Sequence, residues 1–520
     1  MQSLKKMLFG RHLILLWCIL SAQYLFGQPV NKTTSFTING FHLDLRIQVM
    51  KLPALKELAV RLNKNGVNTL IMEYEATFPY NSNPLIANRY AYSKEEIADF
   101  IKFCTGLGID VIPLQQTFGH VEYILRNNRY TELREDQKDL SQVCPSKAEL
   151  NKALFTELFT EMVALHPSKY VHIGGDETHL LGHCPLCKAK AAQEGFAKLY
   201  ADHIKSMCDI VIKLGKIPVM WADIALKYPE ALKYLPKGIV FVDWNYGWDI
   251  NKFGDHEKLM QSGFEIWGAV SLRSSPDNYN LTLWQKHFDN LKDFIPAARN
   301  LGYKGMILTS WSTSGVYSSV AESGYDLLDL VPVRRVYPLT GFNMLIDAFA
   351  ESMRHEQPIN PEKFIVDYCN KNYGFNSNQA IDFWNALKSA PYEVGNGKVK
   401  GPTSLRQLLD STAIASKTIS SLHPTKNQSE YEQYKLMVDI RFQYLKYQFL
   451  EEQVNKQNFT ADKISPINIQ LKGIIDSVKN INQRFIELNK KYYYASELEI
   501  ENELRIRKIQ SLYERLAKDK

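Results

Sequence analysis

Two adjacent carboxylates follow a short apolar run in the first half of the chain. The residues His172-Ile173-Gly174-Gly175 lead directly into Asp176-Glu177. Glycine permits tight turns and the close approach of another group, so a buried strand ending in two glycines would present both acids at its carboxyl end. Neighbouring carboxylates repel each other, and we therefore expect a raised pKa in at least one, as a general acid needs. A solvated turn, or a helix start that favours acids, is the alternative interpretation.

Further polar and aromatic residues follow other apolar runs. Six tryptophans fall between residues 221 and 311, and four of them close a predicted strand. Flat aromatic faces pack against the C–H surface of a sugar ring, while carboxylates and arginine bind its hydroxyls. This pattern favours a sugar pocket, although any single tryptophan could equally belong to a core. The candidate pocket residues are Arg46, Glu75, His120, Trp221, Asp243, Trp244, Tyr246, Trp267 and Trp311.

The elements that must position these residues alternate between strand and helix. Strands so apolar are typical of parallel sheets, which are buried on both faces. Eight such units predict an α/β fold, a closed (β/α)8 TIM barrel, whose active sites lie at the carboxyl ends of the strands. A doubly wound open sheet is the alternative, but no glycine-rich phosphate fingerprint follows the first strand. The predicted strands are 41–48, 67–74, 109–115, 169–174, 217–221, 238–244, 264–269 and 305–311, and helices are expected at 52–64, 93–107, 147–166 and 188–214.

The pattern changes near residue 345. The stretches 431–457 and 467–518 are long, mixed in charge and carry aromatic and leucine residues at helical spacing. We therefore predict a catalytic barrel over residues 28–344 and an all-helical domain over 345–520. This second domain could include an antiparallel pair of long helices.

The first 27 residues have the three parts of a secretory signal. Lys5, Lys6 and Arg11 form the basic start, the segment from Leu13 to Leu20 is apolar, and the chain could be cleaved after Gly27; no acid is present. We therefore expect an exported protein, periplasmic or secreted, whose mature chain has no membrane span. The formal charge of +6 falls to +3 without these three cations, and no dense basic stripe indicates nucleic-acid binding.

The mature chain would keep six sparse cysteines, too few for a disulfide scaffold. Cys104, Cys208 and Cys369 lie in apolar helical patterns typical of buried thiols. The sequence Cys184-Pro-Leu-Cys187 is different, because His179 and His183 precede it and Cys144 could approach it in space. A zinc site, a short disulfide and a reduced loop are the three interpretations of this segment.

Several motifs resemble glycoside hydrolase family 20, the β-N-acetylhexosaminidases. His172-Ile-Gly-Gly-Asp-Glu177 matches the H-x-G-G-D-E motif of that family, and Gly119-His120 matches its upstream Gly-His pair. The finer resemblance, to the hexosaminidase D type, spans about residues 41–340. It is carried by Glu73-Tyr-Glu75, Gln116-Thr-Phe-Gly-His120, Trp244-Asn-Tyr-Gly247 and Thr309-Ser-Trp-Ser312.

The resemblance implies an exo-acting, retaining β-N-acetylhexosaminidase that cleaves N-acetylhexosamine-containing glycans. Glu177 would be the general acid/base, and Asp176 would orient the 2-acetamido group, whose oxygen attacks C1 to give an oxazolinium ion. Trp221, Trp244 and Trp311 would wall the acetamide pocket with Tyr246 as hydrogen-bond partner. Arg46 would hold distal hydroxyls and His120 would support the acids. The resemblance implies no metal and no organic cofactor.

Departures from the family pattern affect the expected sugar contacts. Leu114 and Gln116 stand where most members have Glu and Asp, and Trp311-Ser312-Thr313 replaces a Trp-x-Glu sequence. The choice between GlcNAc and GalNAc therefore stays open, as do the natural glycan, its linkage and the oligomeric state. A non-catalytic carbohydrate-binding protein on the same barrel and a metal-dependent hydrolase are the alternative functions.

Overall fold

The structure is a computed structural model that describes residues 36–274, 277–278, 280–312, 317–319, 330–332, 336–390, 394–395, 398–399 and 401–518. Phe36–Lys520 form one compact unit. The predicted signal segment, residues 1–27, lies outside the described residues. No helix within the described ranges combines the length and the apolar character that a membrane crossing requires.

Eight strands form a closed barrel in which every neighbouring pair is parallel. The order around the barrel is β1-β10-β9-β8-β7-β6-β3-β2. Each of the eight observed strands overlaps one of the eight predicted ones, so the predicted TIM barrel is confirmed. They are β1 (Ile38–Asp44), β2 (Thr69–Glu73), β3 (Asp110–Leu114), β6 (Tyr170–His172), β7 (Ile217–Trp221), β8 (Val240–Trp244), β9 (Glu265–Arg273) and β10 (Gly305–Ser310).

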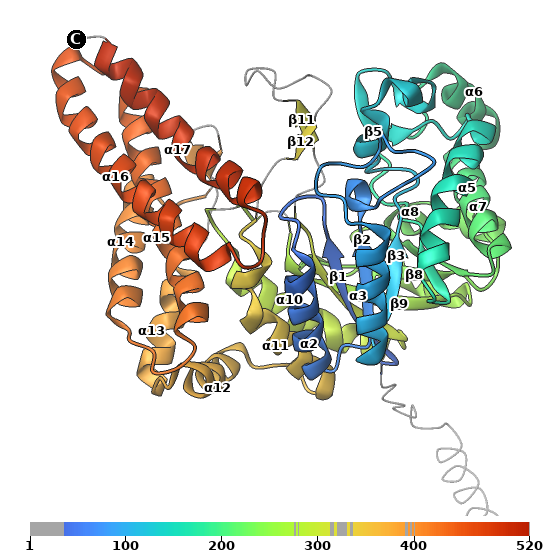
Figure 1. The fold of residues 1–520 in the computed structure, drawn as a ribbon, viewed down its shortest axis with the longest axis horizontal. Helices are drawn as coiled ribbons and strands as arrows, with labels where there is room; N and C mark the ends of the chain where they lie inside the picture. Colours follow the sequence, from blue (N-terminus) through green and yellow to red (C-terminus); the bar gives the residue numbers. More distant parts are fainter. Residues whose placement is uncertain are drawn as a thin grey trace, which may run out of the picture. The chain divides into compact units, whose positions relative to one another are not determined.

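Helices follow the strands and surround the barrel (Figure 1). Helix α3 begins as the sequence predicts, since Ser93 caps it and Glu96 completes a capping box. The predicted segment 188–214 is two helices, because Gly195 has a φ of 86° and interrupts it. The barrel helices are α2 (Leu52–Lys64), α3 (Lys94–Gly106), α5 (Ala148–Leu165), α6 (Pro185–Glu194), α7 (Phe196–Lys213), α8 (Asp223–Lys227), α9 (His256–Gln261), α10 (Trp284–Asn300) and α11 (Asn343–Arg354).

An insertion between β3 and α5 was not predicted. It contains α4 (Glu122–Leu125) and an antiparallel hairpin of β4 (Arg134–Asp136) with β5 (Asp139–Val143). The hairpin escapes prediction because β4 is short and polar and lacks apolar alternation. Its backbone joins the site-bearing loops, since Val143 N–H donates to the Phe118 carbonyl and Val121 N–H donates to the Ser141 carbonyl.

The barrel interior is packed with apolar and aromatic side chains rather than open. Ile71, Ile112, Val219, Val242 and Ile307 form one buried cluster inside the strands. Alternate residues such as Phe241 face outward and join a larger core between strands and helices. The strands are therefore buried on both faces, and only residues at their ends can reach a ligand.

The strands described after the barrel are limited to one short hairpin, β13 (Val394–Gly395) with β14 (Lys398–Val399), and the other elements described there are helices. In Figure 1 the last four helices lie together, and each packs on the next along the chain. Asn482 and Asn502 exchange hydrogen bonds across the last two helices, which pack as an antiparallel pair. The helices are α12 (Pro361–Tyr373), α13 (Ser377–Lys388), α14 (Leu405–Ser421), α15 (Gln428–Val454), α16 (Ile464–Asn489) and α17 (Ala495–Lys518).

Candidate active site

The loop after β6 carries the two acids to the carboxyl end of the barrel. Gly174 and Gly175 have φ angles of 70° and 93°, which favour glycine. A Cβ on Gly174 would lie 1.9 Å from Gln116 Oε1, so the glycine also makes room for a neighbouring side chain. Asp176 is buried, whereas the Glu177 side chain is 38% exposed. Glu177 is thus the acid that opens to solvent.

His120 lies between the two acids. Its Nε2 is 3.4 Å from Asp176 Oδ2 and 3.3 Å from Glu177 Oε2. Burial would lower the pKa of His120, but the charges and hydrogen bonds of Asp176 and Glu177 raise it well above its usual value. The preceding Gly119 is equally constrained, because a Cβ there would lie 2.6 Å from the Asp176 carbonyl oxygen. The acid pair and the imidazole therefore form one rigid unit.

The expected raised pKa is not found at Glu177. Burial would raise the pKa of this carboxyl, but the hydrogen bond and charge of His120 bring it below its ordinary value. Asp223, at the start of α8, has the raised pKa instead. Burial, together with the charge of Asp176, raises the pKa of Asp223 to about 7. The prediction did not consider that His120, as a cation, lies between the two acids and offsets their repulsion.

Asp223 also positions Glu177 directly. Its Oδ2 accepts a hydrogen bond from the Glu177 backbone N–H at 3.1 Å, and its Oδ1 accepts one from Trp244 Nε1 at 3.3 Å. Sequence reasoning missed this role, although Asp223 follows the strand that ends in Trp221. Only that strand-end position could have indicated it, because a bond to a backbone N–H leaves no pattern in the sequence.

Arg46 and Glu75, two of the predicted site residues, contact each other. Arg46 Nε donates to Glu75 Oε1 at 2.9 Å, and Arg46 Nη2 lies 3.6 Å from Glu73 Oε1. Glu73 also lies 2.9 Å from His42 Nε2. Burial would raise the pKa of Glu73, but bonding to His42 and the charge of Arg46 lower it to about 2. These charges form a buried network beside the acid pair.

Four aromatic residues lie at the carboxyl ends of β7, β8 and β10: Trp221 and Trp244 close β7 and β8, and Tyr246 and Trp311 follow β8 and β10. The ring centroids of Trp221 and Trp311 are 5.6 Å apart, and those of Trp244 and Tyr246 are 5.2 Å apart. Trp311 Nε1 donates to the Tyr246 hydroxyl at 2.7 Å and joins the two pairs. Trp221 is fully buried, while Trp244 and Trp311 are half-buried. The four rings therefore form one continuous group with two partly accessible tryptophans.

Two predicted site residues lie elsewhere. β9 continues to Arg273, so Trp267 lies in the lower barrel interior, 5.2 Å from the Tyr170 ring, and does not close a strand. Asp243 faces outward from β8, where its Oδ2 accepts from Tyr303 at 2.6 Å and contacts His256 Nε2 at 2.8 Å. Strand alternation explains the second error, because Val242 and Trp244 take the inward positions. Thr313 lies outside the described residues.

Backbone strain is concentrated at the same end of the barrel. Six non-glycine residues of the described chain have a left-handed φ, and four of them follow barrel strands. These four are Gln48, Glu75, His120 and Glu177, with φ between 46° and 56°. Such conformations cost free energy and persist where the surrounding structure holds them. The strain therefore marks the carboxyl ends of β1, β2, β3 and β6 as the functional face.

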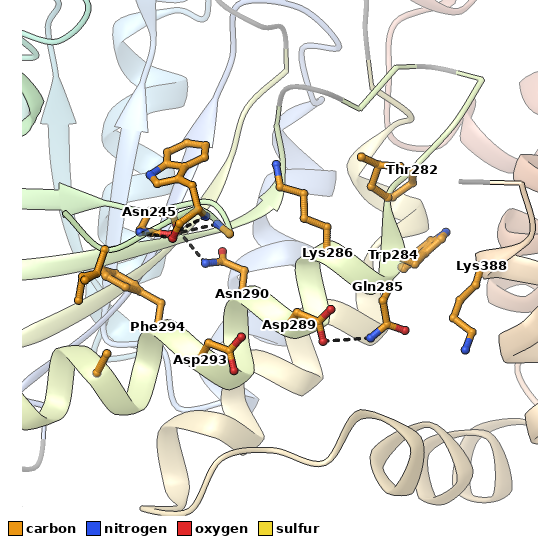
Figure 2. A pocket seen from close by; sticks show the side chains of 15 residues that line it. Asn245, Thr282, Trp284, Gln285, Lys286, Asp289, Asn290, Asp293, Phe294 and Lys388 are labelled. Carbon is orange, nitrogen blue, oxygen red and sulfur yellow. Dashed lines mark hydrogen bonds between the residues drawn. The ribbon is translucent and has the colours of Figure 1, made fainter. Parts of the chain in front are cut away.

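A separate cavity of about 700 Å³ lies on the outer side of the barrel wall. Figure 2 shows it between the loop after β8 and helix α10, with Lys388 at one side. Asn290 in its lining donates to the Asn245 carbonyl at 2.8 Å. Its lining includes neither the acid pair nor His120, so it is distinct from the candidate active site.

Comparisons with known proteins identify relatives of this chain. The profile described as "Glycosyl hydrolase family 20, catalytic domain" matches residues 34–269. Hexosaminidase D of Bos taurus is 30% identical over 298 residues, which cover 54% of this chain and 86% of the bovine protein. Hexosaminidase D of Homo sapiens is 29% identical over 307 residues, 56% of this chain but only 63% of the human protein.

One solved structure supports the fold. A β-N-acetylhexosaminidase from Bacteroides fragilis superposes with a TM-score of 0.50 at 19% identity, covering 65% of this chain and 70% of that chain. At that identity the similarity concerns the fold alone.

Proposed function

The chain belongs to glycoside hydrolase family 20 and is a glycoside hydrolase of the β-N-acetylhexosaminidase type, and from this premise we propose how it acts. It removes terminal β-linked N-acetylhexosamine residues from glycans with retention of configuration. The substrate's own acetamide oxygen serves as the nucleophile. The observation that carries this proposal is the contact of one His120 nitrogen with both carboxyls.

An ordinary retaining glycosidase needs a second protein carboxylate on the opposite side of the sugar from the general acid. In such enzymes the acid and the nucleophile stand about 5–5.5 Å apart on opposite sides of the scissile bond. Asp176 and Glu177 are chain neighbours that contact the same imidazole nitrogen, so they approach a sugar from one side. This arrangement supports substrate-assisted catalysis, which family 20 uses as an exception to the two-carboxylate scheme.

The two acids have different roles in the proposal. Glu177 is the more exposed, so it protonates the leaving oxygen and then activates the water that opens the oxazolinium ion. Asp176 is buried, and its Oδ1 has no hydrogen-bond partner among the described residues. An acetamide N–H would satisfy this oxygen, and the carboxylate would stabilise the positive charge that develops on the nitrogen.

The aromatic group would form the acetamide pocket. Trp221, Trp244 and Trp311 offer apolar walls, and the Tyr246 hydroxyl is held by Trp311 Nε1. Arg46, held by Glu75, would bind distal hydroxyls. Gln116 donates to Glu73 Oε1 at 3.0 Å, so this departure from the family pattern extends the buried network beside the sugar site. We also propose that the protein acts outside the cytoplasm, after export by its N-terminal segment.

Hydrolysis of matched aryl glycosides tests the proposal. We expect release of nitrophenol from aryl β-GlcNAc or β-GalNAc and negligible release from aryl β-glucoside, because only the first two carry the nucleophile. A thiazoline mimic of the bicyclic intermediate should inhibit strongly. Comparable rates on the glucoside, or a covalent ester trapped with a fluorosugar, would contradict the mechanism. No hydrolysis of either N-acetylhexosaminide would leave a sugar-binding protein as the better description.

A further inference from the structure

Three cysteines and one glutamate converge beside the loop that carries the catalytic acids. They come from three segments: Glu135 lies on β4, Cys144 follows β5, and Cys184 and Cys187 lie at the start of α6. One potential ligand atom from each lies within 4.8 Å of all the others. We propose that these four side chains bind a structural zinc ion.

The sulfur positions fit a metal centre better than a disulfide. Cys144 Sγ lies 3.6 Å from Cys184 Sγ and 3.5 Å from Cys187 Sγ. A zinc–sulfur bond of about 2.3 Å places two tetrahedral sulfurs about 3.8 Å apart. In a disulfide the two sulfur atoms are bonded at a distance of about 2.05 Å. Because three thiols share one location, any disulfide among them would also leave a third thiol beside it.

The carboxylate completes the set of ligands. Glu135 is buried, and its Oε2 lies 3.3 Å from Cys187 Sγ. The Cys184 backbone N–H donates to its Oε1 at 2.7 Å and orients the group toward the sulfurs. No Lys, Arg or His of the described chain lies within ion-pair distance of this carboxylate. A divalent cation would therefore compensate a buried charge that is otherwise costly.

The surrounding groups support bound thiolates. The Cys187 N–H points to Cys184 Sγ at 3.4 Å, and Ser146 Oγ lies 3.0 Å from Cys187 Sγ. The sulfurs lie at the first turn of α6, where the helix dipole favours negative charge. His183 is not a ligand, because its Nε2 pairs with Asp136 Oδ2 at 2.9 Å and its side chain is 52% exposed.

Four protein ligands define a closed site, which is typical of structural rather than catalytic zinc. Cys184 ends the loop that begins at Asp176 and Glu177, and Leu180 N–H in that loop donates to Gln142 Oε1 on β5. The metal would therefore fasten the β4–β5 hairpin to the loop that carries the acid pair. It takes no part in the bond-breaking step.

Metal analysis of the purified full-length chain tests this proposal. After incubation with Zn²⁺ and gel filtration, we expect about one zinc per wild-type chain. We expect a large loss of zinc in Cys184→Ala and in Glu135→Gln, and full zinc content in His183→Asn and Cys369→Ala. Replacement by Co²⁺ should give the thiolate-to-cobalt absorption band in the wild type and in these two control variants, and not in Cys184→Ala. Zinc retained equally by the Cys184 and Glu135 variants would overturn the assignment.

Two further measurements do not depend on hydrolysis. A strong chelator should lower the midpoint of thermal unfolding of the wild type and leave that of Cys184→Ala unchanged. Alkylation under denaturing, non-reducing conditions should modify Cys144, Cys184 and Cys187 alike. A disulfide-linked peptide pair from this cluster, or three free thiols in a chain that never takes up zinc, would overturn the proposal while leaving the proposed glycosidase untouched.

Discussion

Glu177 carries the sharpest prediction at the scale of single residues. Replacing it with Gln removes the proton donor but keeps the side-chain size, so substrate binding should change little. General acid catalysis contributes about 10²–10⁴-fold, and we expect a loss of that order in kcat on an unactivated glycan. Aryl substrates with good leaving groups should suffer less in the first step. A variant within tenfold of wild type on the glycan would contradict the assignment.

His120 should set the pH range of activity. His120, Asp176 and Glu177 titrate as one coupled cluster. The kcat/KM of the free enzyme therefore depends on how many protons the cluster holds, and not on which group holds them. Because Asp176 and Glu177 raise the pKa of His120, wild-type activity should fall only well above the usual range of histidine. In His120→Gln the imidazole is absent, and the proton needed for catalysis must be held by Glu177. The fall in kcat/KM at alkaline pH should therefore occur at a lower pH than in the wild type.

The pH profile of His120→Gln needs a histidine control outside the cluster. His183→Gln is suitable, because this residue is exposed and pairs with Asp136 instead. Its profile should coincide with that of the wild type. An unchanged alkaline limb in His120→Gln would mean that another group holds the proton.

At the scale of elements, Gly119 lies where the loop after β3 meets the backbone of the loop after β6. Alanine there would place its Cβ 2.6 Å from the Asp176 carbonyl oxygen, so one loop must move. A displacement of about 1 Å can cost about 10²-fold in rate, and we expect kcat/KM to fall by that order. Gly473→Ala is the matched control, since a Cβ there meets no atom within 4 Å. Equal activities of the two variants would refute this role.

The elements themselves could be predicted largely from the sequence, whereas their side-chain partners could not. Apolar runs of strand length and the alternation with helices indicated all eight barrel strands, and the helix expected at 93–107 is observed as α3. The position of Trp267 was wrong because β9 continues beyond its apolar run into Ser271 and Arg273. Asp223 was missed because its partner is a backbone N–H formed only by the fold.

At the scale of the whole molecule, the helical region supports the barrel face that carries the site. The Gln48 backbone N–H donates to Glu497 Oε2 on α17 at 2.8 Å, and Lys51 N–H donates to the Tyr492 carbonyl at 2.8 Å. Gln48 lies in the loop after β1, two residues beyond Arg46, and has a φ of 54°. The last helix therefore stabilises a strained loop that holds a proposed sugar ligand.

Substitution of Glu497 tests this support. In Glu497→Ala the buried Gln48 N–H loses this acceptor, which should lower the free energy of unfolding by about 1–3 kcal/mol. KM should rise as the Arg46 loop loosens, while kcat changes less. Glu499→Ala on the exposed side of the same helix should match the wild type in urea unfolding and kinetics. Equal stability of both variants would show that α17 does not support this loop.

The site residues for proton transfer and those for the acetamide come from different halves of the barrel. Arg46, Glu75, His120 and the acid pair follow β1, β2, β3 and β6, whereas the rings that would contact the acetamide lie at the ends of β7, β8 and β10. Proton chemistry and acetamide recognition could then diverge separately among relatives. An exchange of the second half-barrel would transplant the acetamide pocket and leave the acid machinery, and Arg46 for the distal hydroxyls, in place. Asp223 belongs to the second half and accepts a hydrogen bond from the Glu177 N–H in the first half, so such a chimera must keep this residue.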